Sequence, residues 1–105
     1  MTIRVLVPSG ALGLNYDKRA LNRGLNRNPD IIAIDGGSTD SGPAYLGQGI
    51  SKYSRISTKA EWKGLMKARE VANIPLLIGT AGTCGTNRSV DWFFEITKEI
   101  AKELD

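Results

Sequence analysis

Three short apolar runs, each followed by a segment rich in glycine and small polar residues, constrain the fold of this chain more than any other feature. The runs are IRVLVP (3–8), IIAI (31–34) and IPLLIG (74–79), and all are rich in branched aliphatic residues. Runs of this length and composition are typical of buried strands. Helix-type patterns follow them, so the sequence predicts alternating strands and helices around a parallel sheet with right-handed crossovers.

The helix candidates show apolar residues at helical spacing. They span residues 16–28, 58–73 and 88–104. Thr58 and Glu61 have the spacing of a capping box, which predicts the start of the second helix. Asn73 is expected to end that helix, and Asn87 is expected to cap the third.

The predicted fold is a three-layer, Rossmann-like βαβαβα arrangement of the α/β class. At 105 residues the chain fits a single domain, 1–105. Three strands leave both edges of a parallel sheet unpaired, and exposed edges are normally paired or covered. We therefore expect the sheet to be extended by dimerisation or by a missing C-terminal part, the chain then being a fragment or subunit of a longer protein.

Composition narrows the function classes. Hydrophobic residues at 41% and charged residues at 24% are ordinary globular values. No apolar run reaches the roughly 20 residues that span a bilayer, so we expect no membrane partner. The net charge of +3 is too small an excess to predict a nucleic-acid partner. The single cysteine, Cys84, fits a reducing compartment and a cytoplasmic location.

The absence of histidine limits the available chemistry. It excludes Ser-His-Asp and Cys-His catalysis and most zinc sites built within this chain. Catalysis by this chain would have to use carboxylates, hydroxyls, amides, basic side chains or Cys84.

The loops that follow the strands are the predicted functional site. In an open parallel sheet these loops gather at one edge, where ligands bind. They are Pro8–Asn15, Gly36–Ser57 and Thr80–Asn87, and all three are rich in glycine and small polar residues. The turns at the opposite edge are short.

The third loop leads into a helix and is a candidate anion cradle, because backbone amides at a helix start attract negative charge. Its candidate ligand-binding residues are Thr80, Gly82, Thr83, Gly85, Asn87 and Arg88. The alternative is a helix entry whose glycines serve only the turn. Cys84, with no histidine partner, is expected to fill the loop rather than to act as a nucleophile.

The second loop, DGGSTDSGP (35–43), carries the candidate catalytic residues. Asp35 and Asp40 are predicted acid–base or polar groups, and a divalent metal held by both is the weaker alternative. The further candidate ligand-binding residues of the first two loops are Ser9, Gly10, Gly36, Gly37, Ser38, Thr39 and Tyr45. The structural alternative is that Asp35 caps local amides and that two glycines make a tight turn.

Several segments together resemble a known family. VLVPSGALG, IIAIDGGSTDSGPAYLGQG and IPLLIGTAGTCGTNRSVDW are similar, in order, to the N-terminal part of the acyclic terpene utilisation (AtuA-like) family. The resemblance implies a role in the breakdown of acyclic terpenes through CoA thioesters. IDGGST also resembles the phosphate loop of actin-like sugar kinases, but DSGPAYLGQG follows where a hairpin strand is expected.

The predicted function is a small-molecule-binding α/β module, part of an enzyme that acts on a carboxylate, phosphate or acyl-CoA compound in terpenoid or related catabolism. The expected ligand is a small anion, and whether the chain alone is an enzyme stays open. The alternative is a non-catalytic binding or assembly subunit whose glycine-rich loop edge docks a partner chain. A homo-oligomer or association with a larger chain is expected in either case.

Overall fold

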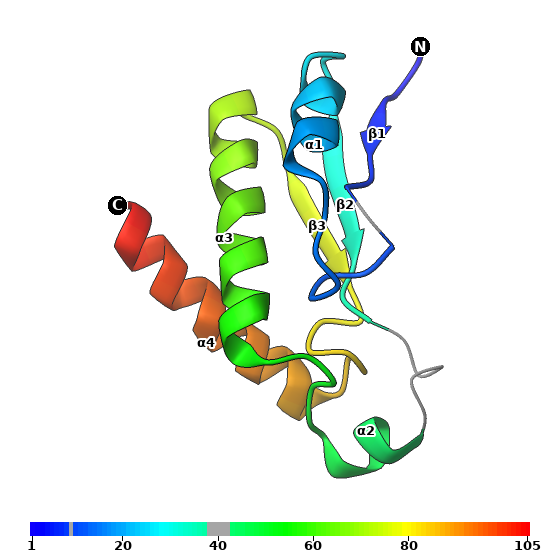
Figure 1. Ribbon diagram of the computed structural model, residues 1–105, viewed down its shortest axis with the longest axis vertical. Helices are drawn as coiled ribbons and strands as arrows, with labels where there is room; N and C mark the ends of the chain where they lie inside the picture. The colour runs from blue at the N-terminus through cyan, green and yellow to red at the C-terminus, as the bar shows by residue number, and fades with distance from the viewer. Residues whose placement is uncertain (9, 38–42) are drawn as a thin grey trace.

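The computed structural model describes residues 1–8, 10–37 and 43–105, and within them the chain forms a small parallel sheet with helices packed beside it (Figure 1). The elements in chain order are β1 (Val5–Leu6), α1 (Lys18–Leu25), β2 (Ile31–Asp35), α2 (Pro43–Gln48), α3 (Arg55–Ala72), β3 (Leu76–Gly79) and α4 (Asn87–Leu104). The predicted α/β class and parallel sheet are confirmed, while two helices rather than one lie between β2 and β3. The short helix α2 was not predicted.

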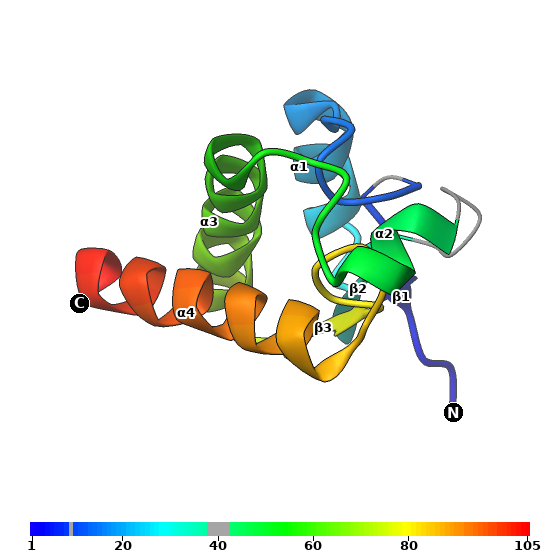
Figure 2. The ribbon, with the colours of Figure 1, turned by 90° about the horizontal axis from the view of Figure 1, so that it is seen from below.

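The three-stranded sheet has the order β1-β2-β3, and both strand pairs are parallel. Val5 is in register with Ile31, and Ile34 is in register with Ile78. Both crossovers move in the same direction across the sheet, and right-handed crossovers of that kind place their helices on one face. Figure 2 shows α1 and α3 together on the same side of the strands.

The other face of the sheet is open, so the expected third layer is not formed by the described residues. Val5, Val7 and Leu77 point to this face and are 56%, 60% and 58% exposed. The strand order does not reverse, so the helices of both right-handed crossovers lie on one face. α4 instead packs beside α3, where the Trp62 and Phe93 rings lie 4.8 Å apart.

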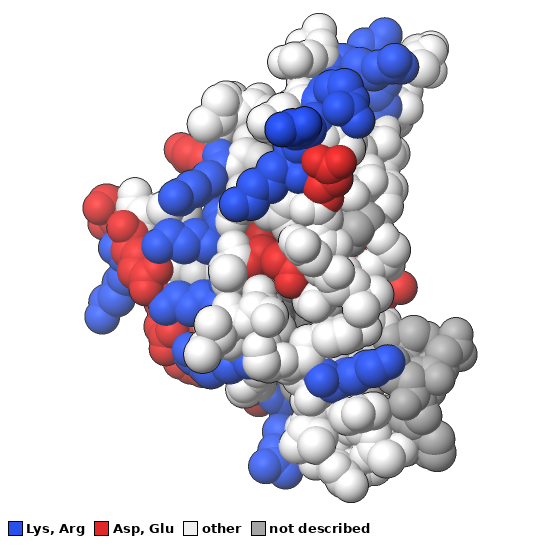
Figure 3. All heavy atoms as spheres, in the orientation of Figure 1, with Lys and Arg blue, Asp and Glu red and all other residues white. Residues whose placement is uncertain are grey.

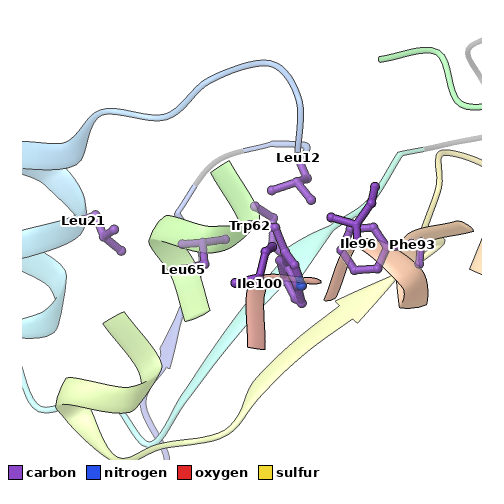
Figure 4. Close-up of a cluster of buried hydrophobic side chains, with 9 residues drawn as sticks. Leu12, Leu21, Trp62, Leu65, Phe93, Ile96 and Ile100 are labelled. Atoms are coloured by element: carbon purple, nitrogen blue, oxygen red, sulfur yellow. The ribbon is translucent and has the colours of Figure 1, made fainter. Parts of the chain in front are cut away.

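The core lies between the covered face of the sheet and the helices (Figure 4). Leu65, Ile96 and Ile100 are fully buried there. The indole Nε1 of Trp62 donates a hydrogen bond of 3.0 Å to Thr97 Oγ1, so this large side chain is buried without an unpaired donor. The buried members of the cluster are Leu12, Leu21, Ile34, Trp62, Leu65, Ala81, Phe93, Ile96 and Ile100.

The start of α3 differs from its prediction. The helix begins directly after the N-cap Ser54, and Thr58 lies within its first turns. Glu61 does not complete a capping box. Its Oε1 accepts hydrogen bonds from the backbone amides of Gly13, at 3.2 Å, and Asn15, at 2.9 Å. Glu61 thereby ties the first loop to α3.

The ends of the helices show which predicted caps are correct. α4 begins at Asn87, and its N-cap is Thr86, whose hydroxyl accepts a hydrogen bond of 3.2 Å from Ser89 N. The prediction of Asn87 as the cap is therefore wrong by one position. Asn73 does end α3, with the left-handed backbone (φ 56°) that this residue type tolerates better than most.

Candidate functional site

The three loops that follow the strands meet at one edge of the sheet, as predicted. The carboxyl ends of the strands point towards α2 and the start of α4 (Figure 1). Leu12 N donates to Asp35 O at 2.7 Å, which joins the first loop to the second. Gly36 N donates to Gly79 O, also at 2.7 Å, which joins the second loop to the third. Among the predicted site residues, Ser9, Ser38, Thr39 and Asp40 lie outside the described residues.

Asp35 holds two of these loops together. Its Oδ1 accepts hydrogen bonds of 2.9 Å from Gly37 N and from the Thr80 hydroxyl. Thr80 Oγ1 also lies against Gly37 O. Thr80 has a left-handed backbone (φ 48°), which is unfavourable for a β-branched residue, and these contacts offset part of that cost. The described contacts of Asp35 thus match the structural alternative, an Asp that caps local amides.

Two of the predicted ligand-binding glycines serve close approach between loops. A Cβ atom on Gly37 would lie 2.6 Å from Thr83 Cα, and one on Gly82 would lie 2.5 Å from Ser89 O. Both residues have positive φ angles, 136° and 74°. Both positions are also buried, so these glycines let one backbone segment pack on another.

The middle of the candidate anion cradle, at Gly82 and Thr83, is buried, and some of its groups are bonded within the protein. Thr83 is 1% exposed, and its Oγ1 accepts a hydrogen bond of 3.0 Å from Lys52 N. Gly85 N donates to Ala81 O at 3.2 Å. The segment between α2 and α3 therefore covers Thr83, in the middle of the loop where we expected an anion.

Cys84 fills the same loop, as expected. The side chain is 9% exposed, and its Sγ donates to Tyr45 O at 3.4 Å. Tyr45, predicted to touch ligand, contributes its carbonyl to this contact and is only partly buried. No described residue pairs with Cys84 as a catalytic base would, since its neighbouring Ser89 Oγ, at 3.3 Å, is a hydroxyl.

A shallow hollow lies beside Asp35 on the open face of the sheet. Its volume is about 370 Å³, and its floor is apolar. Gly10 and Gly79 reach this hollow, so it joins part of the first loop to the end of β3. The lining residues are Val7, Gly10, Ala33, Ile34, Asp35, Leu77 and Gly79.

A second and more enclosed pocket lies at the start of α4 and contains the predicted residue Arg88. Its volume is about 270 Å³, and Gly49, Ser51, Tyr53 and Trp92 are among its walls. A Cβ atom on Gly49 would lie 3.2 Å from Arg88 Cδ, so a glycine with φ 67° leaves room for the arginine stem.

The composition of this pocket differs from that of the hollow beside Asp35. Arg88 is exposed and forms no ion pair with any described residue. Two aromatic side chains, Tyr53 and Trp92, stand beside it. Sequence reasoning missed both aromatic residues, although the four-residue spacing of Arg88 and Trp92 on a helix places them on one face.

The remaining predicted residues occupy separate positions. Gly36 is buried beneath the third loop, where a Cβ atom would lie 2.7 Å from Gly79 O. Gly85 and Asn87 are exposed near the start of α4. Among the described residues, no three acidic or cysteine side chains gather into a group that could hold a metal ion. Within the same residues, no helix is long and apolar enough to cross a membrane.

Comparisons with known proteins add no relative to this description. The resemblance to the acyclic terpene utilisation family therefore stays a prediction from the sequence. No family model, no curated protein and no solved structure matches this chain.

Proposed function

We propose that this protein is a small-molecule-binding α/β module that takes a small anion carrying a planar or apolar group in the Arg88 pocket. The observation that carries this proposal is one enclosed space of about 270 Å³ that combines an arginine free of described ion pairs with Tyr53 and Trp92. The predicted anionic ligand is retained, and its site moves from the buried loop amides to this neighbouring pocket.

The chemistry of the lining residues supports this ligand class. An arginine guanidinium is planar and always charged, and it pairs with carboxylate or phosphate through two parallel hydrogen bonds. Aromatic side chains offer apolar contact area with little loss of conformational freedom on binding. The pocket is slightly smaller than the roughly 300–1,000 Å³ of drug-sized ligand sites, so it fits one small ring with one acidic group.

The proposal concerns binding rather than a reaction. A CoA thioester is larger than this pocket, so only one phosphate-bearing end of it would enter, and the family resemblance favours such a compound in terpenoid catabolism. Acid–base roles for Asp35 and Asp40 stay predictions, since the described contacts of Asp35 hold its own loops together. A cytoplasmic location follows from the cysteine usage and is part of the same proposal.

Tryptophan fluorescence provides the test. Trp92 lines the pocket, whereas Trp62 is 5% exposed in the core, so a bound ligand changes the emission of Trp92 alone. Benzoate, phenyl phosphate and acetyl-CoA are the probes, and we expect a saturable change with at least one of them. In Arg88→Gln the apparent affinity should fall at least tenfold. Lys102→Gln is the control, because it removes an equal charge from the other end of α4.

Two results would contradict the proposal. One is the absence of any saturable signal up to millimolar concentrations of all three probes. The other is an equal loss of affinity in Arg88→Gln and Lys102→Gln, which would indicate general charge attraction. Trp92→Phe identifies the reporter, since the ligand-dependent signal must disappear in that variant while the protein remains folded.

The assembly-subunit alternative is favoured by a different observation, the open face of the sheet. Parallel sheets are normally covered on both faces, yet Val5, Val7 and Leu77 are more than half exposed. A second copy packed on this face would complete the three-layer, Rossmann-like arrangement. Light scattering should then show a dimer that Leu77→Lys converts to a monomer, and a wild-type monomer at all concentrations would remove this alternative.

A further inference from the structure

A basic surface lies at the other end of the molecule, where the strands begin. We call it the arginine surface and define it by Arg4, Arg19, Arg23 and Arg27. All four side chains are exposed. Figure 3 shows Lys and Arg side chains gathered over the region of α1, with few acidic side chains among them. This surface is separate from the Arg88 pocket, which lies at the carboxyl ends of the strands.

A hydrogen bond joins two of these arginines. Arg4 Nη1 donates a hydrogen bond of 2.6 Å to Arg27 O, which joins the segment before β1 to the turn after α1. Gly24 lies on α1 between two of the arginines, and a Cβ atom at that position would overlap the Leu6 side chain. Because Gly24 has no Cβ atom, α1 can lie close against β1. A hollow of about 650 Å³ opens there, with Asn26, Arg27 and Arg4 on its walls.

The positive charge of the arginine surface is not neutralised by ion pairs with described residues. The six ion pairs among those residues involve other cations, mainly Lys59 and Lys63, which pair with Glu99 and Glu103. Asp17 and Asp30, which lie beside this surface, accept hydrogen bonds from backbone amides. Asp17 caps α1 by accepting from Arg19 N at 2.8 Å, and Asp30 accepts from Arg4 N at 2.8 Å.

The arginines of this surface stand close together in the fold, as contact with an extended polyanion requires. Arg19 and Arg23 are one helical turn apart, about 6 Å along the axis of α1, and Arg27 lies just beyond the end of this helix. One strand of a duplex carries a phosphate for every ~3.4 Å of the duplex axis, so arginines spread over this surface can contact more than one phosphate. Asparagine side chains such as Asn26 commonly add hydrogen bonds to phosphate oxygens.

The surroundings of these arginines favour a duplex over other polyanions. Single-strand binders rely on aromatic stacking platforms, and the described residues lining this hollow include no aromatic side chain. Helices that lie in membrane surfaces insert an apolar face, whereas Leu21 and Leu25 of α1 pack into the protein. We propose that the arginine surface binds the phosphate backbone of double-stranded nucleic acid without reading its sequence.

The net charge of +3 led us to expect no nucleic-acid partner, but a whole-chain sum averages over unlike surfaces. Glu99 and Glu103 of α4 form ion pairs with lysines of α3, so these negative charges do not neutralise the arginines of α1. An extended polyanion that approaches this end of the molecule is attracted by the local positive potential of the arginine surface.

Fluorescence anisotropy with a labelled 20-base-pair DNA duplex tests the proposal. We expect saturable binding at 50 mM salt that weakens as salt increases. In the variant Arg23→Gln/Arg27→Gln the dissociation constant should rise at least tenfold. The slope of log K against log salt should become shallower by about 2, because each lost phosphate contact contributes about 0.9. Lys98→Gln/Lys102→Gln, with the same charge change on α4, should bind within twofold of wild type.

Three outcomes would overturn the proposal. The first is no duplex binding at 50 mM salt, and the second is equal weakening in the α4 control variant. The third is tighter binding to a single strand of equal length or to phosphatidylserine vesicles than to the duplex, which would assign the surface to another polyanion. Circular dichroism melting of each variant shows that the fold is retained, since all the substituted side chains are exposed.

Discussion

The carboxylate of Asp35 allows the sharpest test of whether the loop edge is built for stability or for chemistry. Asp35→Ala removes the acceptor of two hydrogen bonds of 2.9 Å, one from Gly37 N and one from the Thr80 hydroxyl. Hydrogen bonds to charged groups contribute roughly 1.5–3 kcal/mol each, and solvent exposure of Asp35 places these at the low end or below. We therefore expect a loss of about 2 kcal/mol in the free energy of unfolding, or roughly 10 °C in Tm for a domain of this size.

Urea denaturation measures this loss directly, and Asp35→Asn is the matched control. Asparagine keeps a side-chain oxygen that can accept from Gly37 N or Thr80, so its cost should stay below about 1 kcal/mol. Asp35→Ala combined with Thr80→Ala should cost less than the sum of the single variants, because both remove the same hydrogen bond. Unchanged stability of Asp35→Ala, or strict additivity with Thr80→Ala, would show that the carboxylate does not hold the loops.

Two further changes test the packing and the charges. Gly82→Ala should cost at least about 3 kcal/mol of unfolding free energy in urea titration, because the new Cβ would lie 2.5 Å from Ser89 O at a positive φ. Gly47→Ala has nothing within 4 Å and is its control, expected to be neutral or slightly stabilising. Hydrogen bonds from Lys59 and Lys63 lower the pKa of Glu103 to about 2. Its contribution is therefore complete above pH ~4.5 and lost as the pH falls towards 2, so the acid dependence of urea midpoints should be shallower in Glu103→Gln.

The strands and the shared edge of the loops could be predicted because both depend on local patterns. A short run of branched apolar residues has few stable alternatives to a buried strand, and parallel strands must bring their following loops to one edge. The run IIAI at 31–34 is confirmed as β2, which continues to Asp35. The first run is shorter than predicted, since only Val5–Leu6 pairs with β2.

The open face of the sheet could not be predicted from the same runs. A continuous apolar run indicates burial on both faces, but it does not say whether the second cover belongs to the same chain. Leu76 and Ile78 face the helices, whereas Leu77 between them is exposed, and all three residues are equally apolar. Which face of β3 is covered depends on the strand order, and the strand order is a property of the whole fold.

The roles of the loop residues depend on partners that are distant in sequence. Glu61 has the spacing of a capping box, yet its oxygen binds the amides of Gly13 and Asn15. Gly37 and Gly82 are candidate ligand-binding residues in the sequence, yet each accommodates another segment of backbone. A glycine that admits a ligand and a glycine that admits a neighbouring loop look identical in sequence, because both roles require only the absence of a Cβ atom.

The distribution of charge also depends on contacts between residues that are distant in sequence. It places the two proposed binding regions apart from one another. Lys59 and Lys63 belong to α3 and Glu99 and Glu103 to α4, and only the packing of these helices brings the four together. Arg88 and the arginines of the arginine surface form no ion pair with a described residue, and they stand at opposite ends of the strands. Arg88 of α4 lines a small aromatic pocket near the carboxyl ends of the strands, and the arginine surface lies near their amino ends. A small ring with one acidic group fits the first, and only an extended polyanion can contact several arginines of the second. Losses of affinity in Arg88→Gln and in Arg23→Gln/Arg27→Gln should therefore be independent of one another.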